Sequence, residues 1–320
     1  MSQEKHKNFK FKHSLGQNFI TDEFLLEDIA DESGIGKDDF VLEIGPGNGA
    51  LTRCLCDRAK HVVIVEIDKS LIPLLKSNLK EYNNVSIINA DFLNYDFSNI
   101  INEFQNVARI ARDDVEANHC ESALVGADTI HPIKVVANLP YYITSPIIQN
   151  LLQNPYISEM TLMVQKEVAE RIVAVPGNKD FGVLTLACNY FADTEMIMIV
   201  SKECFFPKPK VDSAVVHFKK HDFVGAKHCE PAPVGTKHCE PALVGASYAS
   251  PIINSDYEKL FKLIKASFAQ RRKKLLNSLT NAGYDKNILT TAFSKLNFDE
   301  NVRAENLSLN DYKNLLINLS

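Results

Sequence analysis

The alternation of short apolar runs with helix-like segments between residues 40 and 165 is the feature that most constrains the fold. The strand-sized runs are FVLEIG (40–45), HVVIVEID (61–68), VSIINAD (85–91), IKVVANLPY (133–141) and EMTLMVQ (159–165). Continuous apolar runs that end in polar residues are typical of parallel strands buried on both faces of a sheet. Strands in alternation with helices predict right-handed crossovers, and therefore an α/β fold with a doubly wound, mostly parallel sheet.

Two further regions complete the expected architecture. The runs TEMIMIVS (194–201) and DSAVVHFKK (212–220) lie close together and predict an antiparallel pair at the edge of the sheet. From about residue 256 the apolar residues recur three or four positions apart, which indicates helices. We therefore expect a first domain over residues 1–220 and a small all-helical domain over residues 256–320.

Three near-copies of one nonapeptide do not belong to this scheme: HCESALVGA (119–127), HCEPAPVGT (228–236) and HCEPALVGA (238–246). They predict an insertion at about 106–131, in the connection to the fourth strand, and a repeat-containing linker over 221–255. Their His-Cys pairs offer soft metal ligands. Adjacent residues rarely bind one zinc ion, however, and the copies lie in different connections. We favour tolerated surface insertions and expect no metal site.

Composition excludes several classes of protein. The chain of 320 residues is 45% hydrophobic and 23% charged, which is typical of a soluble globular protein. No apolar run reaches the length that spans a bilayer, and the basic N-terminus lacks the apolar core of a secretory signal. The seven cysteines are irregularly spaced, which favours reduced thiols. We therefore expect a cytoplasmic protein with no membrane partner.

The segment EIGPGNGALT (43–52) forms a glycine-rich connection between a strand and a helix. Gly45, Gly47 and Gly49 permit positive φ and close approach of a ligand to the backbone. Glu66 ends the next strand, where a carboxylate can accept both ribose hydroxyls of a nucleoside. A simple tight turn and a solvated strand-end carboxylate are the alternative interpretations of these two features.

The glycine spacing argues against a dinucleotide cofactor. GPGNG lacks the third glycine of G-x-G-x-x-G, and no basic group for a pyrophosphate is evident. S-adenosylmethionine, which has no phosphate, fits the pattern better. Asp91 ends the third strand and is placed to accept a hydrogen bond from the amino group of the cofactor's adenine. Phe92 beside it either packs on the adenine ring or belongs to the core.

The segment ANLPYY (137–142) follows the fourth strand, whose carboxyl end faces the same crevice. The side-chain carbonyl of Asn138 and the backbone carbonyl of Leu139 would accept the two amine protons of a target adenine, which directs the nitrogen lone pair at the methyl group. Pro140 has no N–H to compete, and Tyr141 would stack on an extruded base. A strand-end turn with buried tyrosines is the alternative, and we expect Tyr142 in the core.

Several motifs, taken together, resemble a family. They are KHSLGQNFI (12–20), EIGPGNGALT, VEID (65–68), NADF (89–92), NLPYYITSPI (138–147) and FFPKPKVDSAV (205–215). In this order they resemble the ribosomal RNA adenine dimethyltransferases over residues 10–220. The nearest members modify two adjacent adenosines near the 3′ end of 16S rRNA. The resemblance implies an S-adenosylmethionine-dependent class I methyltransferase domain, a C-terminal helical RNA-binding domain and a role in ribosome biogenesis.

The resemblance also implies site residues. Cofactor contacts carry over to Asn18, Ile20, Gly45, Gly47, Glu66, Asp91 and Asn138. Ile20 stands where leucine is usual, which an apolar or backbone contact should survive. The target-base residues carry over to Asn138, Leu139, Pro140, Tyr141 and Phe205, the last as a second aromatic wall around the flipped adenine. A core phenylalanine at a strand end is the alternative for Phe205.

Local charge supports an RNA partner although the net charge is −5. The segment 264–279 contains no acidic residue, and Lys208, Lys210, Lys219 and Lys220 form a second basic cluster. Such side chains bind phosphates without regard to sequence. The cations expected to contact RNA are Lys208, Lys210, Arg271, Arg272, Lys273 and Lys274; Lys5, Lys7, Lys10 and Lys12 form a third cluster. A solvated face is the alternative. We expect a monomer that binds 16S rRNA within the 30S subunit or its precursor.

Two other functions remain open from the sequence alone. The same motifs serve 23S rRNA adenine N6-methyltransferases of the antibiotic-resistance type, although FFPKPKVDSAV and the basic helical tail favour the small subunit. A non-catalytic ribosome-assembly factor is the second alternative. Such a factor would have lost catalytic activity. The sequence argues against this loss, because it keeps Gly45, Glu66, Asp91 and NLPY.

Overall fold

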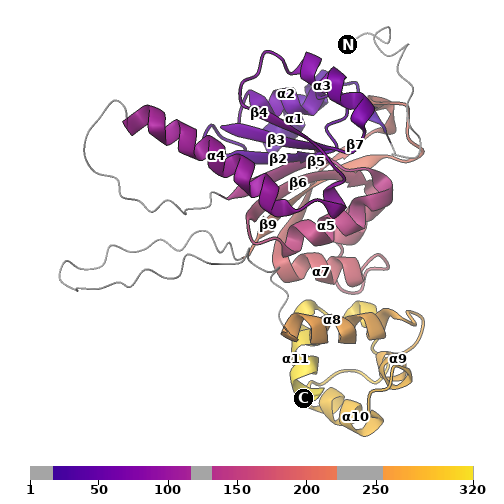
Figure 1. Ribbon diagram of the computed structural model, residues 1–320. Coiled ribbons are helices and arrows are strands. Elements are labelled where there is room, and N and C mark those ends of the chain that lie inside the picture. The colour runs from indigo at the N-terminus through magenta and orange to yellow at the C-terminus, as the bar shows by residue number, and fades with distance from the viewer. Residues whose placement is uncertain (1–16, 117–131, 222–254, 320) are drawn as a thin grey trace, which may run out of the picture.

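The fold is an α/β sheet domain followed by a group of C-terminal helices (Figure 1). The structure is a computed structural model, and it describes residues 17–116, 132–221 and 255–319 of the 320. The three nonapeptide repeats and the four N-terminal lysines of the third basic cluster lie outside the described residues. Within them, no helix is both long enough and apolar enough to cross a membrane.

A seven-stranded sheet in the order β4-β3-β2-β5-β6-β9-β7 forms the centre of the molecule. Its strands are β2 (Phe40–Ile44), β3 (His61–Glu66), β4 (Val85–Asn89), β5 (Ile133–Asn138), β6 (Ile157–Gln165), β7 (Ala192–Val200) and β9 (Ser213–Lys220). The strands from β4 to β6 are mutually parallel, whereas β9 runs antiparallel to both β6 and β7. The predicted doubly wound sheet with an antiparallel edge pair is therefore confirmed.

Helices bury both faces of the sheet because neighbouring strand residues point to opposite sides. Val41 packs in a cluster with α1 (Glu23–Glu32), α2 (Ala50–Cys56) and α3 (Ile72–Asn78). Its neighbour Leu42 packs in a second cluster with residues of α4 (Phe97–Glu116), α5 (Thr144–Gln153) and α7 (Val183–Phe191). A short helix, α6 (Lys166–Ile172), follows β6.

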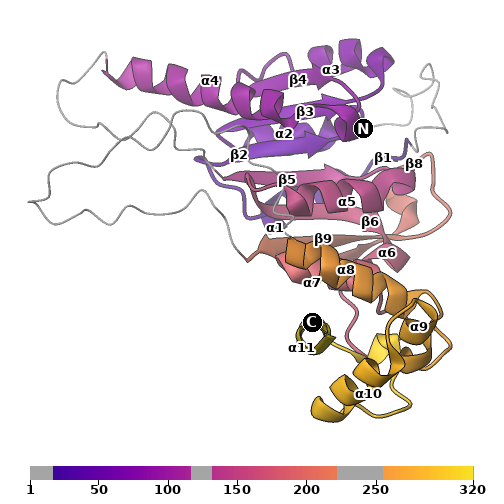
Figure 2. The ribbon, with the colours of Figure 1, turned by 60° about the horizontal axis from the view of Figure 1, so that its bottom comes forward.

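The C-terminal helices continue the second cluster (Figure 2). They are α8 (Ser255–Phe268), α9 (Leu275–Asn281), α10 (Lys286–Lys295) and α11 (Leu309–Leu319). Tyr257 of α8 stacks on Phe261 at a ring-centroid distance of 4.3 Å and meets Tyr190 of α7 at 5.1 Å. The predicted helical region is therefore present. The domain boundaries themselves stay a prediction, because residues 222–254 lie outside the described part of the chain.

Two local features differ from what the sequence indicates. Helix α4 extends to Glu116, so residues 106–116 continue a helix where we expected the insertion to begin. In addition, β1 (Phe19–Ile20) and β8 (Phe205–Phe206) form a separate antiparallel ladder. This ladder joins the N-terminal motif to the FFPKPK segment. Two-residue strands have no periodicity, so the sequence does not reveal the pairing.

Candidate active site

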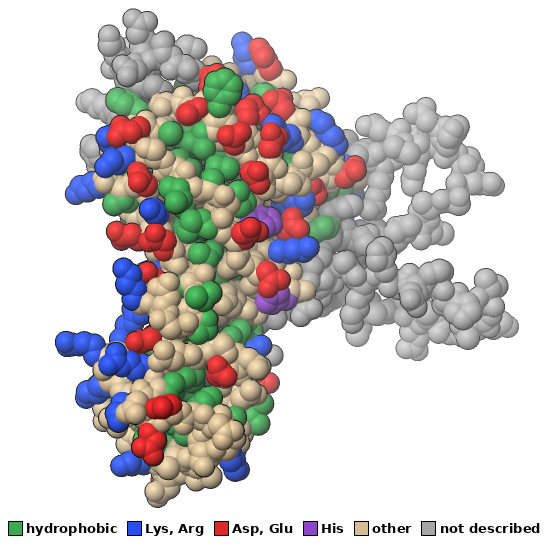
Figure 3. Space-filling model, turned by 180° about the vertical axis from the view of Figure 1, so that it is seen from behind, with side chains coloured by type: hydrophobic (Ala, Val, Ile, Leu, Met, Phe, Trp, Pro, Cys, Tyr) green, Lys and Arg blue, Asp and Glu red, His purple; other side chains and the backbone are tan. Residues whose placement is uncertain are grey.

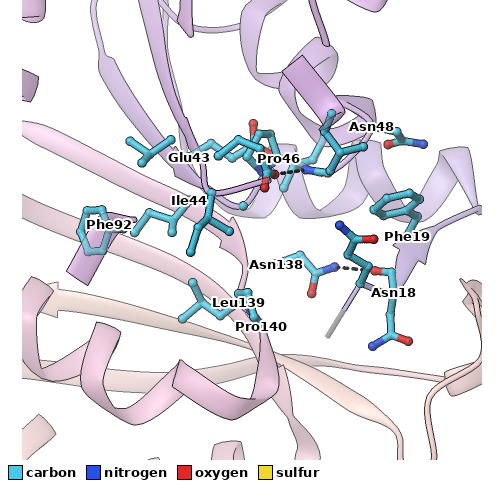
Figure 4. A pocket seen from close by; sticks show the side chains of 18 of the residues that line it. Asn18, Phe19, Glu43, Ile44, Pro46, Asn48, Phe92, Asn138, Leu139 and Pro140 are labelled. Atoms are coloured by element: carbon cyan, nitrogen blue, oxygen red, sulfur yellow. Dashed lines mark hydrogen bonds between the residues drawn. The ribbon is translucent and has the colours of Figure 1, made fainter. Parts of the chain in front are cut away.

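A cavity lies at the carboxyl ends of β2, β3, β4 and β5 (Figure 4). This is the edge at which parallel sheets of this kind bind their ligands. The predicted residues that line it are Asn18, Ile20, Gly45, Gly47, Glu66, Asp91, Asn138, Leu139, Pro140 and Tyr141. Segments far apart in the sequence thus meet at one place. Phe205 is the one predicted cofactor or target-base residue that is not in the wall.

The glycine-rich turn follows β2 and passes beneath the side chain of Phe19. Gly47 has φ of 60°, a conformation that side chains with a Cβ rarely adopt. A Cβ at this position would also lie 2.8 Å from Cε1 of Phe19. Glycine is therefore required at position 47 for two reasons: the backbone conformation and the close packing of β1 on the turn.

Glu66 ends β3 inside the cavity wall and is 4% exposed. One carboxylate oxygen accepts from the backbone N–H of Asp68 at 2.7 Å, and the other accepts from Gly47 at 3.4 Å. Burial raises the pKa of Glu66, and the two backbone donors oppose that rise. The alternative of a solvated strand-end carboxylate is therefore wrong; Glu66 is a buried, oriented hydrogen-bond acceptor.

Asp91 is held at the start of a 3-10 turn, η4 (Phe92–Asn94). Its carboxylate accepts from the backbone N–H of Leu93 at 3.1 Å and from Nδ2 of Asn94 at 2.7 Å. The neighbouring Phe92 is 7% exposed, belongs to the core and also lines the cavity. The core interpretation of Phe92 is therefore confirmed, whereas its packing on the adenine ring stays a prediction.

Asn138 ends β5 with a defined side-chain orientation. Its Nδ2 donates to the backbone carbonyl of Asn18 at 3.2 Å, so the carbonyl oxygen of the amide points away from Asn18 (Figure 4). The backbone N–H of Leu139 donates to Met163 at 3.0 Å, and the Leu139 side chain is 1% exposed. The hydrogen bond of the Asn138 side chain and that of the Leu139 backbone therefore hold the end of β5 in place and orient the side-chain carbonyl of Asn138.

The two tyrosines after Pro140 lie in a 3-10 turn, η5 (Tyr141–Ile143), and differ in their surroundings. The hydroxyl of Tyr141 lies 2.7 Å from Oγ of Ser213, the first residue of β9. Tyr142 is 53% exposed and lines the cavity, so the prediction that it packs in the core is wrong. A 3-10 helix has about three residues per turn, so adjacent side chains diverge and cannot share one environment.

Phe205 is 4% exposed and packs in the cluster that contains Ile20, its partner across the β1–β8 ladder. In this structure it is the core phenylalanine of the alternative interpretation. The exposed ring of the pair is Phe206, at 46%. The stacking of Phe205 on a flipped adenine stays a prediction, and the buried position of the ring does not favour it.

Sequence reasoning missed a buried carboxyl group in the wall. Glu43 is 2% exposed, lines the cavity, and accepts from Oγ1 of Thr52 at 2.6 Å. Both residues lie within EIGPGNGALT, so the available signal was an acidic residue inside an otherwise apolar strand. Burial raises the pKa of Glu43 from 4.5 to about 8, and the negative charge of Glu66 contributes in the same direction.

The raised pKa of Glu43 predicts a pH-dependent stability for the ligand-free protein. Between about pH 4.5 and pH 8 the folded chain holds a proton at Glu43 that the unfolded chain has lost. This contribution is complete below pH 4.5 and disappears as the pH rises through 8. We expect Glu43→Gln to flatten the fall in melting temperature between pH 6 and 8. Equal slopes in wild type and Glu43→Gln, with the exposed Glu195→Gln as control, would contradict the assignment.

Figure 3 shows Lys and Arg side chains on the surface of the molecule, mixed with acidic ones. Lys220 of the second basic cluster is instead buried, and its Nζ donates to the backbone carbonyl of Asn154. Lys208 pairs with Glu203, and Lys210 is exposed. The run from Arg271 to Lys274 forms the exposed turn between α8 and α9. Nη2 of Arg271, however, donates to the backbone carbonyls of Lys179 and Phe181 at 2.7 and 2.8 Å. Arg271 therefore also links the C-terminal helices to the loop between α6 and α7.

Within the described ranges, no group of three or more His, Cys, Asp or Glu side chains could hold a metal ion. The cysteines described there, Cys54, Cys56, Cys188 and Cys204, form no disulfide. The His-Cys pairs of the repeats lie outside those ranges.

The parallel sheet, the glycine-rich turn after β2 and the acidic side chains at the carboxyl ends of β3 and β4 define a class I methyltransferase. A family model described as ribosomal RNA adenine dimethylase matches residues 8–230. The chain belongs to this family.

Individual relatives extend the similarity to nearly the whole chain. A protein of Clostridium acetobutylicum named ribosomal RNA small subunit methyltransferase A is 38% identical over 310 residues, which cover 96% of this chain and 93% of the relative. The protein of that name from Lachnoclostridium phytofermentans is 40% identical over 312 residues, 96% of this chain and 91% of the relative. The resemblance that the sequence motifs indicate is therefore confirmed.

Solved structures show the same fold. A dimethyladenosine transferase from Plasmodium falciparum superposes with a TM-score of 0.64 at 22% identity, covering 93% of this chain and 96% of the other. The 23S rRNA methyltransferase ErmE superposes with a TM-score of 0.60 at 24% identity, covering 94% and 99%. Both matches span the sheet domain and the C-terminal helices.

Proposed function

We propose that this enzyme transfers methyl groups from S-adenosylmethionine to N6 of two adjacent adenosines near the 3′ end of 16S rRNA, giving N6,N6-dimethyladenosine during ribosome biogenesis. One observation carries the proposal: the oriented carbonyl oxygen of Asn138 shares a cavity with the buried carboxylate of Glu66 and with Asp91. The relatives are named for the small ribosomal subunit, which favours 16S over 23S rRNA.

The residues of the cavity fit the proposed cofactor. Glu66 offers a buried carboxylate to the ribose hydroxyls, and Asp91 offers an acceptor to the adenine amino group. The turn at Gly45 and Gly47 lets the ligand approach the backbone. Bound S-adenosylmethionine supplies an electrophilic methyl group on a positively charged sulfur, and a wall that contains the carboxyl groups of Glu66 and Asp91 suits that charge.

The end of β5 prepares the nucleophile. An adenine N6 amine is a poor nucleophile because its lone pair is delocalised into the ring. The carbonyl oxygens of Asn138 and Leu139 accept its two protons, which favours a pyramidal nitrogen with the lone pair directed at the methyl group. No general base is required, because the methylated nitrogen is acidic and releases its proton to solvent. Pro140 presents no N–H that could compete for these acceptors.

The target base needs a rigid surface outside the RNA stack. Tyr141 provides one, because the 2.7 Å contact between its hydroxyl and Oγ of Ser213 fixes the ring against β9. Phosphate contacts from the exposed Lys208, Lys210, Arg272, Lys273 and Lys274 hold the surrounding RNA. Selectivity for the site then comes from the folded shape of the RNA and from its single-stranded adenines.

The basic turn between α8 and α9 should show itself in the salt dependence of binding. We expect Arg272→Ala/Lys273→Ala to weaken RNA binding and to lower the slope of log affinity against log salt by about 0.7–0.9 for each phosphate that is no longer neutralised. The matched control Lys286→Ala/Lys295→Ala removes two exposed cations from α10. Filter binding to a 3′-terminal 16S fragment measures the affinity of both double variants at several salt concentrations. Equal salt slopes for the two double variants and wild type would show that the turn does not contact the RNA.

The proposed substrate is tested by a direct comparison. Purified enzyme with tritiated S-adenosylmethionine is offered unmethylated 30S subunits or protein-free 23S rRNA. We expect methyl incorporation into 30S subunits only. Incorporation into 23S rRNA alone would assign the chain to the large-subunit activity, and incorporation into neither, with normal cofactor binding, would support a non-catalytic assembly factor.

A further inference from the structure

Tyr142 is an exposed aromatic side chain in the cavity wall that the proposed mechanism does not use. It is 53% exposed, although it lines the same cavity as Glu66 and Asp91. A half-exposed tyrosine ring in this wall leaves an apolar surface open to solvent. Such a surface gains stability when a flat ligand covers it.

Tyr142 lines the cavity together with Glu66 and Asp91, the two residues proposed to hold the ribose and the adenine of the cofactor. Burial raises the pKa of the Tyr142 hydroxyl, and the negative charges of Asp91 and Glu66 raise it further. Charge interactions of this kind weaken with distance and with screening by water. The effect of both carboxylates on Tyr142 agrees with their shared position in the cavity wall.

Tyr141 has a different position in the same turn. Its hydroxyl contacts Oγ of Ser213, a fully buried residue at the start of β9. In the sheet β9 lies beyond β6 from β5, whereas β3 and β4 lie on the opposite side of β5. The 3-10 geometry of η5 makes adjacent side chains diverge, so the Tyr142 ring lines the cavity without sharing the position of Tyr141 at β9.

We propose that Tyr142 is a cofactor-binding residue whose ring covers the adenosyl group of S-adenosylmethionine, while Tyr141 serves the target adenine. This inference rests on the proposed function. The two consecutive tyrosines then form separate walls for two purines, one on each side of the Asn138 carbonyl group. Asn138 lies at the boundary because it ends β5, the strand between the two groups.

Loss of the Tyr142 ring should affect the cofactor and the product of the reaction equally. S-adenosylmethionine and the product S-adenosylhomocysteine share the adenosyl group, so loss of the ring should weaken both to the same degree. Stacking of a nucleic-acid base on an aromatic side chain, judged by alanine substitution, corresponds to a change of about tenfold or more in affinity. We expect Tyr142→Ala to raise both dissociation constants about tenfold. Tyr142→Phe keeps the ring and should stay within about twofold of wild type.

Isothermal titration of the full chain with each ligand tests the proposal, with Phe24→Ala as a matched control. Phe24 is 85% exposed on α1 and does not line the cavity, so its loss should change neither dissociation constant. Equal binding by wild type and Tyr142→Ala would overturn the inference and leave the cofactor site intact. An equal loss in Tyr142→Phe and Tyr142→Ala would also overturn it, because the hydroxyl rather than the ring would then matter.

The same titrations distinguish a failure of the proposed function from a failure of the role proposed for Tyr142. If wild type binds neither ligand, the proposed function itself fails, and the role of Tyr142 fails with it. If Tyr142→Ala binds both ligands normally but raises KM for unmethylated 30S subunits, Tyr142 belongs to the target-base side and the inference is overturned. Melting temperatures of all variants show whether each one is folded.

Discussion

Asn138→Ala is expected to lower methyl transfer by about 10²- to 10³-fold, the loss seen when one preorganised hydrogen-bonding group is removed from an active site. The substitution removes the carbonyl that orients the adenine amine. It also removes the 3.2 Å hydrogen bond to the backbone of Asn18. That bond supports a cavity wall, so cofactor affinity should fall by only a few-fold. Single-turnover transfer to unmethylated 30S subunits measures the first effect, and isothermal titration the second.

A matched control separates this effect from a general loss of structure. Asn287→Ala removes an exposed asparagine of α10, far along the chain from the cavity wall, and should leave both measurements unchanged. Asn138→Ala with wild-type single-turnover rates would exclude the proposed role. A variant that loses cofactor affinity and rate in equal proportion would make Asn138 a cofactor-binding residue alone.

Glu66→Gln is expected to weaken S-adenosylmethionine binding by about 10²-fold. The substitution keeps the shape but replaces a carboxylate with an amide, and hydrogen bonds to a buried charged acceptor contribute about 1.5–3 kcal/mol each. The new NH₂ group would also face a backbone donor, since Asp68 and Gly47 both donate to the carboxylate. Isothermal titration measures the change, and the exposed Glu81→Gln serves as the control. Binding within threefold of wild type would show that Glu66 does not hold the ribose.

Most of the sheet could be predicted because its signal is local. Each sheet strand was visible as an apolar run, such as the one from Phe40 to Ile44, and the carboxyl ends of parallel strands meet by topology. The sequence alone therefore predicts that Glu66, Asp91 and Asn138 lie close together. The N-terminal contacts Asn18 and Ile20 required the family resemblance, since no periodicity marks that segment.

The features of the site that the sequence does not reveal share a physical cause. Burial of Phe205 depends on a two-residue ladder with Ile20, a residue far away in the sequence, and no local pattern reports such a pairing. Exposure of Tyr142 depends on the rotation of one 3-10 turn, which the letters YY do not specify. The raised pKa of Glu43 depends on complete burial beside Glu66, a property of the folded chain alone.

Mapping of the methylated bases shows which atoms of the 16S rRNA the enzyme modifies. Unmethylated 30S subunits are incubated with enzyme and S-adenosylmethionine, and the 3′ end of the 16S rRNA is then analysed by mass spectrometry. We expect two adjacent adenosines, each with two methyl groups on N6, and only a small fraction of this modification with Asn138→Ala over the same incubation time. Methyl groups at another atom or another base, or full modification by Asn138→Ala, would contradict this expectation.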